Sequence, residues 1–159
     1  MSINIYNVGM QQKGWIVLSG CIWLGAGISL LYKGLHFIAD GILLPHSLSA
    51  HLQGLFGSAH YAGNGLIACA LLVGFLKGRF VLSKTADRVV QRIRSQTLPI
   101  RLSQVYAPSY WILISAMVCL GVFIRFLPIP IDMRGWIDVV IGSALIQGSI
   151  FYFRALRFL

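Results

Sequence analysis

The sequence predicts an all-α, polytopic membrane protein with four transmembrane helices. Three observations predict this class: the composition, the long uncharged intervals, and a one-sided distribution of cations. Of the 159 residues, 57% are hydrophobic and only 11% are charged, with a mean hydropathy of +0.79. A soluble domain is about 25% charged. The composition therefore excludes a disordered chain, a coiled coil and an ordinary soluble enzyme, and the length suits a single integral membrane domain over residues 1–159.

The first helical hairpin is predicted over residues 14–77. Between Lys13 and Lys33 lie 19 uncharged residues, and a helix needs about 20 apolar residues to cross a hydrocarbon core of ~30 Å. We therefore expect spans at 14–33 and 54–77. Residues 35–52 between them are too few to span and too apolar for an open loop, and Pro45 interrupts them. They are predicted to form an outer re-entrant or interfacial segment.

The second hairpin is predicted over residues 108–154, with spans at 109–127 and 135–154. Tyrosine and tryptophan prefer the headgroup level, because their rings are apolar and their tips are polar. Such residues stand near the ends of the first, third and fourth predicted spans: Trp15, Tyr32, Tyr110, Trp111, Trp136 and Tyr152. This pattern supports the predicted boundaries.

The two hairpins resemble each other in sequence. Shifting the first span by 96 residues onto the third gives seven identities in 17 positions, beginning with Trp15 on Trp111. The second and fourth spans match less well. The alignment predicts a parallel internal repeat, with its pseudo-twofold axis along the membrane normal. Convergence of two apolar helices on similar compositions is the alternative.

Small residues recur four positions apart in these spans, a spacing that lets two helix backbones approach closely in lipid. The pairs are Ala59 and Gly63, Gly74 and Gly78, Ala144 and Gly148, and Gly25 and Ser29. They predict either packing within the chain or the seam of a homo-oligomer.

Cation placement predicts the orientation. Of the 13 Lys and Arg residues, 10 fall on one side of the predicted topology, mostly in the segment 77–101. Cytoplasmic loops carry such an excess, so both termini are predicted to be cytoplasmic, in the cell membrane. The net charge of +9 is thereby explained as a topology signal, and no nucleic-acid partner is expected.

The cytoplasmic linker, residues 78–107, contains a predicted basic amphipathic helix. Ala86, Val89, Val90 and Ile93 recur at helical spacing and form an apolar stripe. The predicted basic face consists of Lys84, Arg88, Arg92 and Arg94. The helix is expected either to lie at the membrane surface or to continue the second span. Its cations serve orientation and solvation alone, or they bind anionic lipid headgroups or a protein partner.

Among the polar residues in the predicted spans, His60, Asn64 and Gln147 are the ones expected at depth. Polar groups at depth tend to face a bundle interior or a cavity. They are candidates for an intramembrane polar patch on a permeation path, with interhelical hydrogen bonding as the alternative. Asp138, together with Arg134 and Arg125, is a candidate for an interfacial ion pair, or for a coupling carboxylate in transport.

No catalytic, cofactor-binding or metal-binding residues are predicted. The four histidines, His36, His46, His51 and His60, lack the spacing of helical metal motifs. The three cysteines, Cys21, Cys69 and Cys119, all fall in spans and form no redox motif. The letters Leu-Ser-Gly-Cys ending at Cys21 match a lipoprotein processing box, but the apolar run continues beyond the cysteine, which favours a transmembrane helix.

Two functions are the main candidates. The first is a small transporter or channel subunit, favoured by the repeat and the deep polar groups. The alternative is a non-enzymatic accessory or assembly protein that recruits a partner or anionic lipid through the basic loop 77–101. An enzyme acting on lipids or quinones is a third and weaker candidate, because the chain has no Glu and only one carboxylate near a span.

Overall fold

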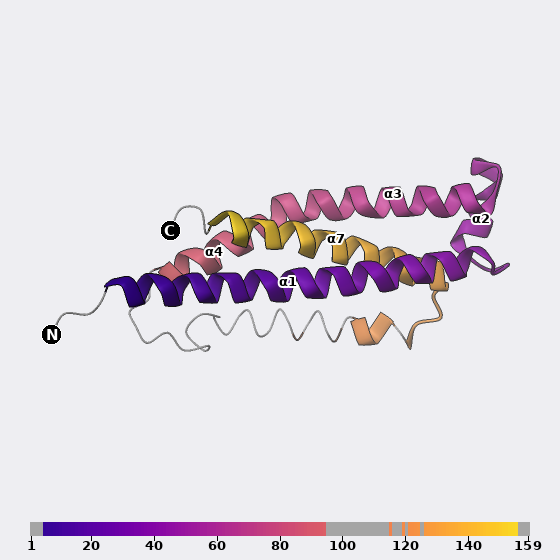
Figure 1. Cartoon of the computed structure of the whole chain (residues 1–159). Helices are drawn as coiled ribbons and strands as arrows, with labels where there is room; N and C mark the ends of the chain where they lie inside the picture. The colour runs from indigo at the N-terminus through magenta and orange to yellow at the C-terminus, as the bar shows by residue number, and fades with distance from the viewer. Residues whose placement is uncertain (1–4, 95–114, 116–118, 120, 125, 156–159) are drawn as a thin grey trace.

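The computed structural model describes residues 5–94, 115, 119, 121–124 and 126–155, and this part of the chain is helical without strands. Figure 1 shows a long bundle with α7 between α1 and α3. In chain order, its elements are α1 (Ile5–Ile42), α2 (Leu48–Phe56), α3 (Ala59–Lys77), the π-helix η1 (Gly78–Leu82), α4 (Ser83–Arg94) and α7 (Ile131–Ala155).

Three of the described helices are long and apolar enough to cross a membrane: Lys13–Ile42, Ala59–Leu82 and Ile131–Ala155. These segments confirm the predicted all-helical class for the described residues and support a membrane-embedded protein. They correspond to the first, second and fourth predicted spans. The third, 109–127, falls largely outside the described residues, so the four-span count and the internal repeat stay predictions.

Helix α1 is longer than predicted. It runs for 38 residues, about 57 Å at 1.5 Å per residue. The first part of the predicted outer segment, residues 35–42, is therefore a continuation of α1, and a turn and the start of α2 follow it. The helix ends where Leu44 N–H bonds to the Gly41 carbonyl (3.0 Å) and Pro45 follows. Ser47 then caps α2, its hydroxyl accepting from Ala50 N–H at 3.0 Å.

Helices α1 and α7 pack antiparallel along a seam of glycines. On α1 these glycines recur every seven residues, at Gly20, Gly27, Gly34 and Gly41. A Cβ atom added to Gly27 would lie 2.9 Å from the Gly142 carbonyl oxygen, and one added to Gly34 would lie 2.7 Å from that of Gly135. Backbone thus meets backbone at two levels. A seven-residue repeat keeps one side of α1 facing its partner along the whole seam.

Helix α3 runs parallel to α7 on its other side. Gly74 faces Val140 and Ser143, and Gly78 faces Gln147 one turn further on. This predicted pair of small residues therefore packs within the chain. Gly25 differs, because no described atom lies within 4 Å of a Cβ at that position.

The hydrophobic core lies where α1, α3 and α7 meet. It is built on Ile38, Ala70, Val139 and Val140, with Trp136 packed against them. Tyr152 is also fully buried, and its ring lies 5.6 Å from that of Trp23 across the seam. Tyr152 therefore packs inside the bundle, while its expected place at the headgroup level stays a prediction.

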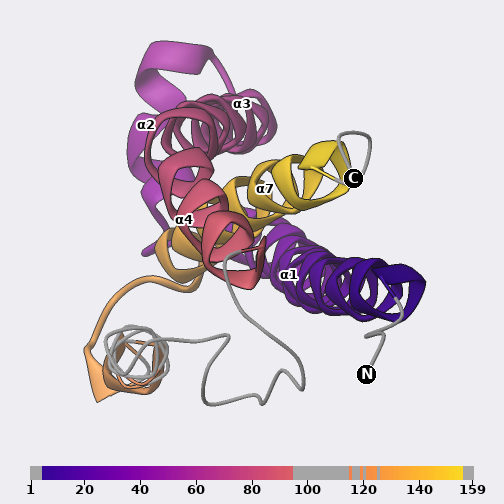
Figure 2. The same cartoon turned by 90° about the vertical axis from the view of Figure 1, so that its left-hand side faces the viewer.

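Helix α4 continues α3 through η1 without a break, so 78–94 of the predicted linker are helical and residues 95–107 lie outside the described part. Val90 is only 5% exposed, and α4 packs across α7 and α1 (Figure 2). Helix α1 begins and α7 ends at this same end of the bundle (Figure 1).

Candidate functional site

The predicted intramembrane patch is not assembled in the described chain. His60 and Asn64 lie in the first two turns of α3, and both are exposed. Gln147 lies against Gly78, just beyond the other end of α3. Asn64 and Gly78 are about 21 Å apart along the helix axis. The three side chains therefore occupy two separate places.

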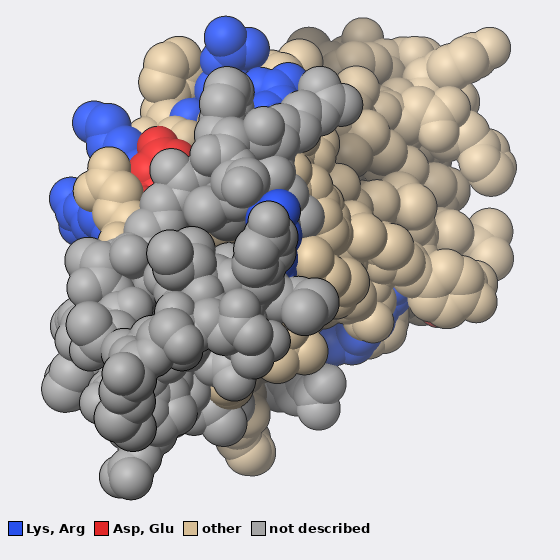
Figure 3. Space-filling model, turned by 60° about the vertical axis from the view of Figure 1, so that its left-hand side comes forward, with Lys and Arg blue, Asp and Glu red and all other residues tan. Residues whose placement is uncertain are grey.

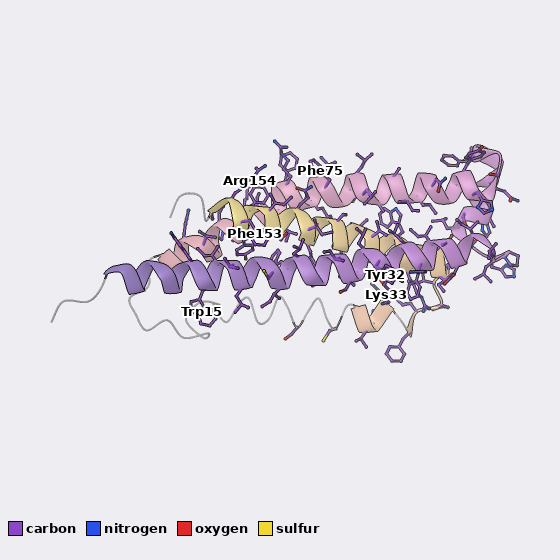
Figure 4. The ribbon with its side chains drawn as sticks, in the orientation of Figure 1. Trp15, Tyr32, Lys33, Phe75, Phe153 and Arg154 are labelled. Carbon is purple, nitrogen blue, oxygen red and sulfur yellow. The ribbon has the colours of Figure 1, made fainter. Side chains whose placement is uncertain are left out.

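Asp138 forms an ion pair with α1. Its Oδ2 lies 3.3 Å from Lys33 Nζ, with the two side chains 20% and 37% exposed. Arg134 instead donates from Nη2 to the Leu127 carbonyl at 2.8 Å, and the side chain of Arg125 lies outside the described residues. Among the described side chains, Asp138 therefore pairs with Lys33, which Figure 4 labels on α1, and not with Arg134 as expected.

The glycine seam explains this pairing. Gly34 on α1 faces Gly135 and Val139 on α7. Lys33 directly precedes Gly34, and Asp138 directly precedes Val139. The close backbone approach brings the ammonium and the carboxylate together from opposite helices. Sequence reasoning used Lys33 only to mark the end of a span. The seven-residue glycine repeat beside it was the signal that could have identified it as facing α7.

The depth of the ion pair follows from the helix register. Gly78 lies opposite Gln147, and Gln147 follows Asp138 by nine residues. Lys77, one residue before Gly78, is therefore about 12 Å from the ion pair along the axis. A hydrocarbon core is ~30 Å thick. If Lys77 and Arg79 reach the headgroups, the Lys33–Asp138 pair lies inside the membrane.

The described side chains on the basic face of α4 are exposed. Lys84 and Arg88 are exposed, as is Asp87 between them, while Val90 is buried against the bundle. The side chains of Arg92 and Arg94 lie outside the described residues, although their backbone belongs to α4. Figure 3 shows cationic side chains gathered around an acidic one at this end.

A buried polar cluster at the opposite end was missed by sequence reasoning. Asp132 is fully buried. Its Oδ2 accepts a hydrogen bond from Ser49 N–H at 2.8 Å, and the Ser49 and Ser47 hydroxyls are 3.0 Å apart. The carboxylate thus satisfies a free N–H in the first turn of α2 and ties that helix to α7. The Ser-x-Ser pattern before α2 was the available signal.

The histidines are exposed and lie at the end of the bundle that carries α2. His51 Nδ1 lies 2.8 Å from the Ser47 carbonyl oxygen, and the His36 ring lies 4.6 Å from that of Tyr32. Within the described residues, no group of three or more His, Cys, Asp or Glu side chains could hold a metal ion.

The chain has no detected similarity to known proteins. Comparison with protein-family models, with curated proteins and with solved structures finds no match.

Proposed function

We propose that this chain is a non-enzymatic, multi-pass membrane protein that recruits an acidic protein partner through the basic face of α4. The observation that carries the proposal is the fixed orientation of that helix. Val90 is buried against the bundle, while Lys84 and Arg88 are exposed. The helix is therefore held in place with its cations directed away from the bundle.

Charge supports an acidic partner. Six exposed cations lie at this end in the described part of the chain, on α1, α3, η1, α4 and α7: Lys13, Lys77, Arg79, Lys84, Arg88 and Arg154. Asp87 is the carboxylate among them on α4. A surface of one sign attracts a partner of the other sign and speeds their association. A fixed helix also loses less conformational entropy on binding than a loose loop does.

The proposed topology has four spans and both termini in the cytoplasm. Helix α4 lies at the end where α1 begins, and α7 begins at the other end (Figure 1). The chain between Arg94 and Ile131 therefore connects opposite ends of the bundle. A third crossing in the predicted 109–127 segment supplies this connection, and the cation excess assigns the α4 end to the cytoplasm.

A second candidate function, a transporter or channel subunit, is favoured by the Lys33–Asp138 ion pair. Intramembrane charges often mark ion or proton pathways, and Asp138 would be the coupling carboxylate. The packing of the described helices favours the recruiting role over this one. Glycine backbones meet along the α1–α7 seam, and His60 and Asn64 lie on the exposed side of α3. Flux in proteoliposomes that is lost in Asp138→Asn would favour transport.

Crosslinking tests the recruiting function. A photo-crosslinker placed at Gln91, which is exposed on α4, should capture one acidic protein in cells, and native mass spectrometry should show it at fixed stoichiometry. Capture should be lost in Lys84→Gln/Arg88→Gln and retained in Lys13→Gln/Lys77→Gln. The control removes the same charge from the same end. Equal loss in both variants, or an oligomer of this chain as the sole product, would contradict the proposal.

A further inference from the structure

The strongest unexplained feature is a cleft of about 620 Å³ at the junction of α3, η1 and α7. Its polar lining consists of Arg79, Gln147 and Arg154. Its apolar lining consists of Phe75, Phe80, Ile150 and Phe151. Two guanidinium groups and an amide thus converge on one hollow whose remaining walls are aromatic and aliphatic.

The fold positions both walls of the cleft. On α7, Gln147, Ile150, Phe151 and Arg154 follow the i, i+3, i+4, i+7 spacing of a single helix face. On the other side, the wide turn of η1 brings Arg79 and Phe80 onto the same side as Phe75. Short π-helices are frequently found at functional sites. Phe75 and Arg154 lie on the same side of the bundle in Figure 4.

The two arginines carry uncompensated charge within the described chain. Among the described residues, the ion pair is Lys33–Asp138, away from the cleft. No described carboxylate therefore neutralises Arg79 or Arg154. Arg154 lies beside the Phe151 ring, with its guanidinium carbon 5.9 Å from the ring centroid. This contact orients the side chain along the cleft wall while its N–H donors remain available.

The chemistry of the cleft fits a phosphate that carries a hydrocarbon chain. Guanidinium groups match phosphate oxygens with paired, charge-assisted hydrogen bonds. The aromatic wall continues into an apolar surface of α3, where Leu72, Phe75 and Leu76 are 65%, 41% and 51% exposed. This surface belongs to a candidate membrane span. An acyl chain can follow it into the bilayer, whereas an acidic protein cannot.

We propose that this cleft binds one anionic phospholipid of the cytoplasmic leaflet. Arg79 and Arg154 bind the phosphate, the Gln147 amide donates to a headgroup oxygen, and the acyl chain packs along Phe80 and Phe75. The site is separate from the basic face of α4, so the lipid and the protein partner can bind at the same time. The bound lipid would also join η1 to the last turn of α7.

The test is native mass spectrometry of the detergent-purified full chain, titrated with phosphatidylglycerol or with phosphatidylcholine of the same acyl chains. We expect one phosphatidylglycerol to bind about tenfold more tightly than phosphatidylcholine. Arg79→Gln/Arg154→Gln should weaken it about tenfold or more. Phe80→Ala, at a side chain 64% exposed whose truncation leaves the core intact, should weaken it about threefold.

Two controls decide the interpretation. Lys84→Gln/Arg88→Gln removes the same charge from α4 and should change lipid affinity less than about twofold. A comparable loss in that control would overturn the site, since general surface charge would then explain binding. Displacement of the lipid by millimolar glycerol phosphate would assign the cleft to a soluble phosphate and overturn the lipid proposal. Failure of crosslinking at Gln91 would count against the partner alone.

Discussion

The ammonium group of Lys33 and the carboxylate of Asp138 lie 3.3 Å apart and join α1 to α7. Lys33 also lies 5.1 Å from the centroid of the Phe37 ring. The two helices lie far apart in sequence, so the pair can form only when α1 and α7 have packed against each other.

The ion pair gives the first prediction. Asp138→Asn should lower the free energy of unfolding in detergent by about 1–2 kcal/mol, because it leaves the Lys33 charge without its partner in a half-buried place. Lys33→Leu/Asp138→Leu should be closer to the wild-type chain, because both charges are removed together. Thermal unfolding followed by circular dichroism measures both. A double variant as unstable as the sum of the single variants would show that the two groups do not interact.

The glycine seam gives the second prediction. Gly34→Ala places a Cβ atom 2.7 Å from the Gly135 carbonyl oxygen, which forces the two backbones apart. We expect a loss of about 1–3 kcal/mol in the free energy of unfolding. Gly54→Ala is the matched control, since no described atom lies within 4 Å of its added Cβ, and it should be neutral or slightly stabilising. Similar effects at the two positions would contradict the seam.

Asp132 gives the third prediction. Asp132→Ala leaves the buried Ser49 N–H without its acceptor, and we expect a loss of about 1–3 kcal/mol in the free energy of unfolding. The effect should be local to α2, so hydrogen exchange should accelerate at Ser49 more than in the core around Val139. Asp40→Asn, at an exposed carboxylate on α1, is the control. Uniform acceleration across all helices would mean that Asp132 supports the whole bundle instead.

The topology gives the fourth prediction. In a chain whose three cysteines are replaced, His46→Cys should react with a membrane-impermeant maleimide on intact cells. Lys84→Cys should react only after permeabilisation, because α4 is assigned to the cytoplasmic side. Both native side chains are exposed, so failure to react will reflect sidedness. Labelling of both residues on intact cells would refute the assignment.

Hydropathy located the apolar helices but did not predict how far α1 continues beyond its apolar span. The predicted span 54–77 became α3 (Ala59–Lys77), and 135–154 became α7 (Ile131–Ala155), since long uncharged runs have few other stable structures. The continuation of α1 to Ile42 was missed, because helix formation beyond the apolar layer depends on propensity and capping. Hydropathy reports neither.

The partners of individual side chains were less predictable. Asp138 was expected beside Arg134, its neighbour one turn away, because sequence spacing shows contacts only within a helix. Its contact with Lys33 depends on which helices pack and in what register. The same limit applies to Gln147, which was grouped with His60 by depth in the membrane and is instead brought to Arg79 by the register of α3 on α7.

The seam between α1 and α7 also sets the order of assembly. Helix α1 emerges early from the ribosome, and α7 is synthesised after every other described helix. During that interval the glycine face of α1 has no native partner, so the bundle closes only when its last helix arrives. A chain interrupted before Ile131 would therefore leave the glycine face of α1 without α7 to cover it.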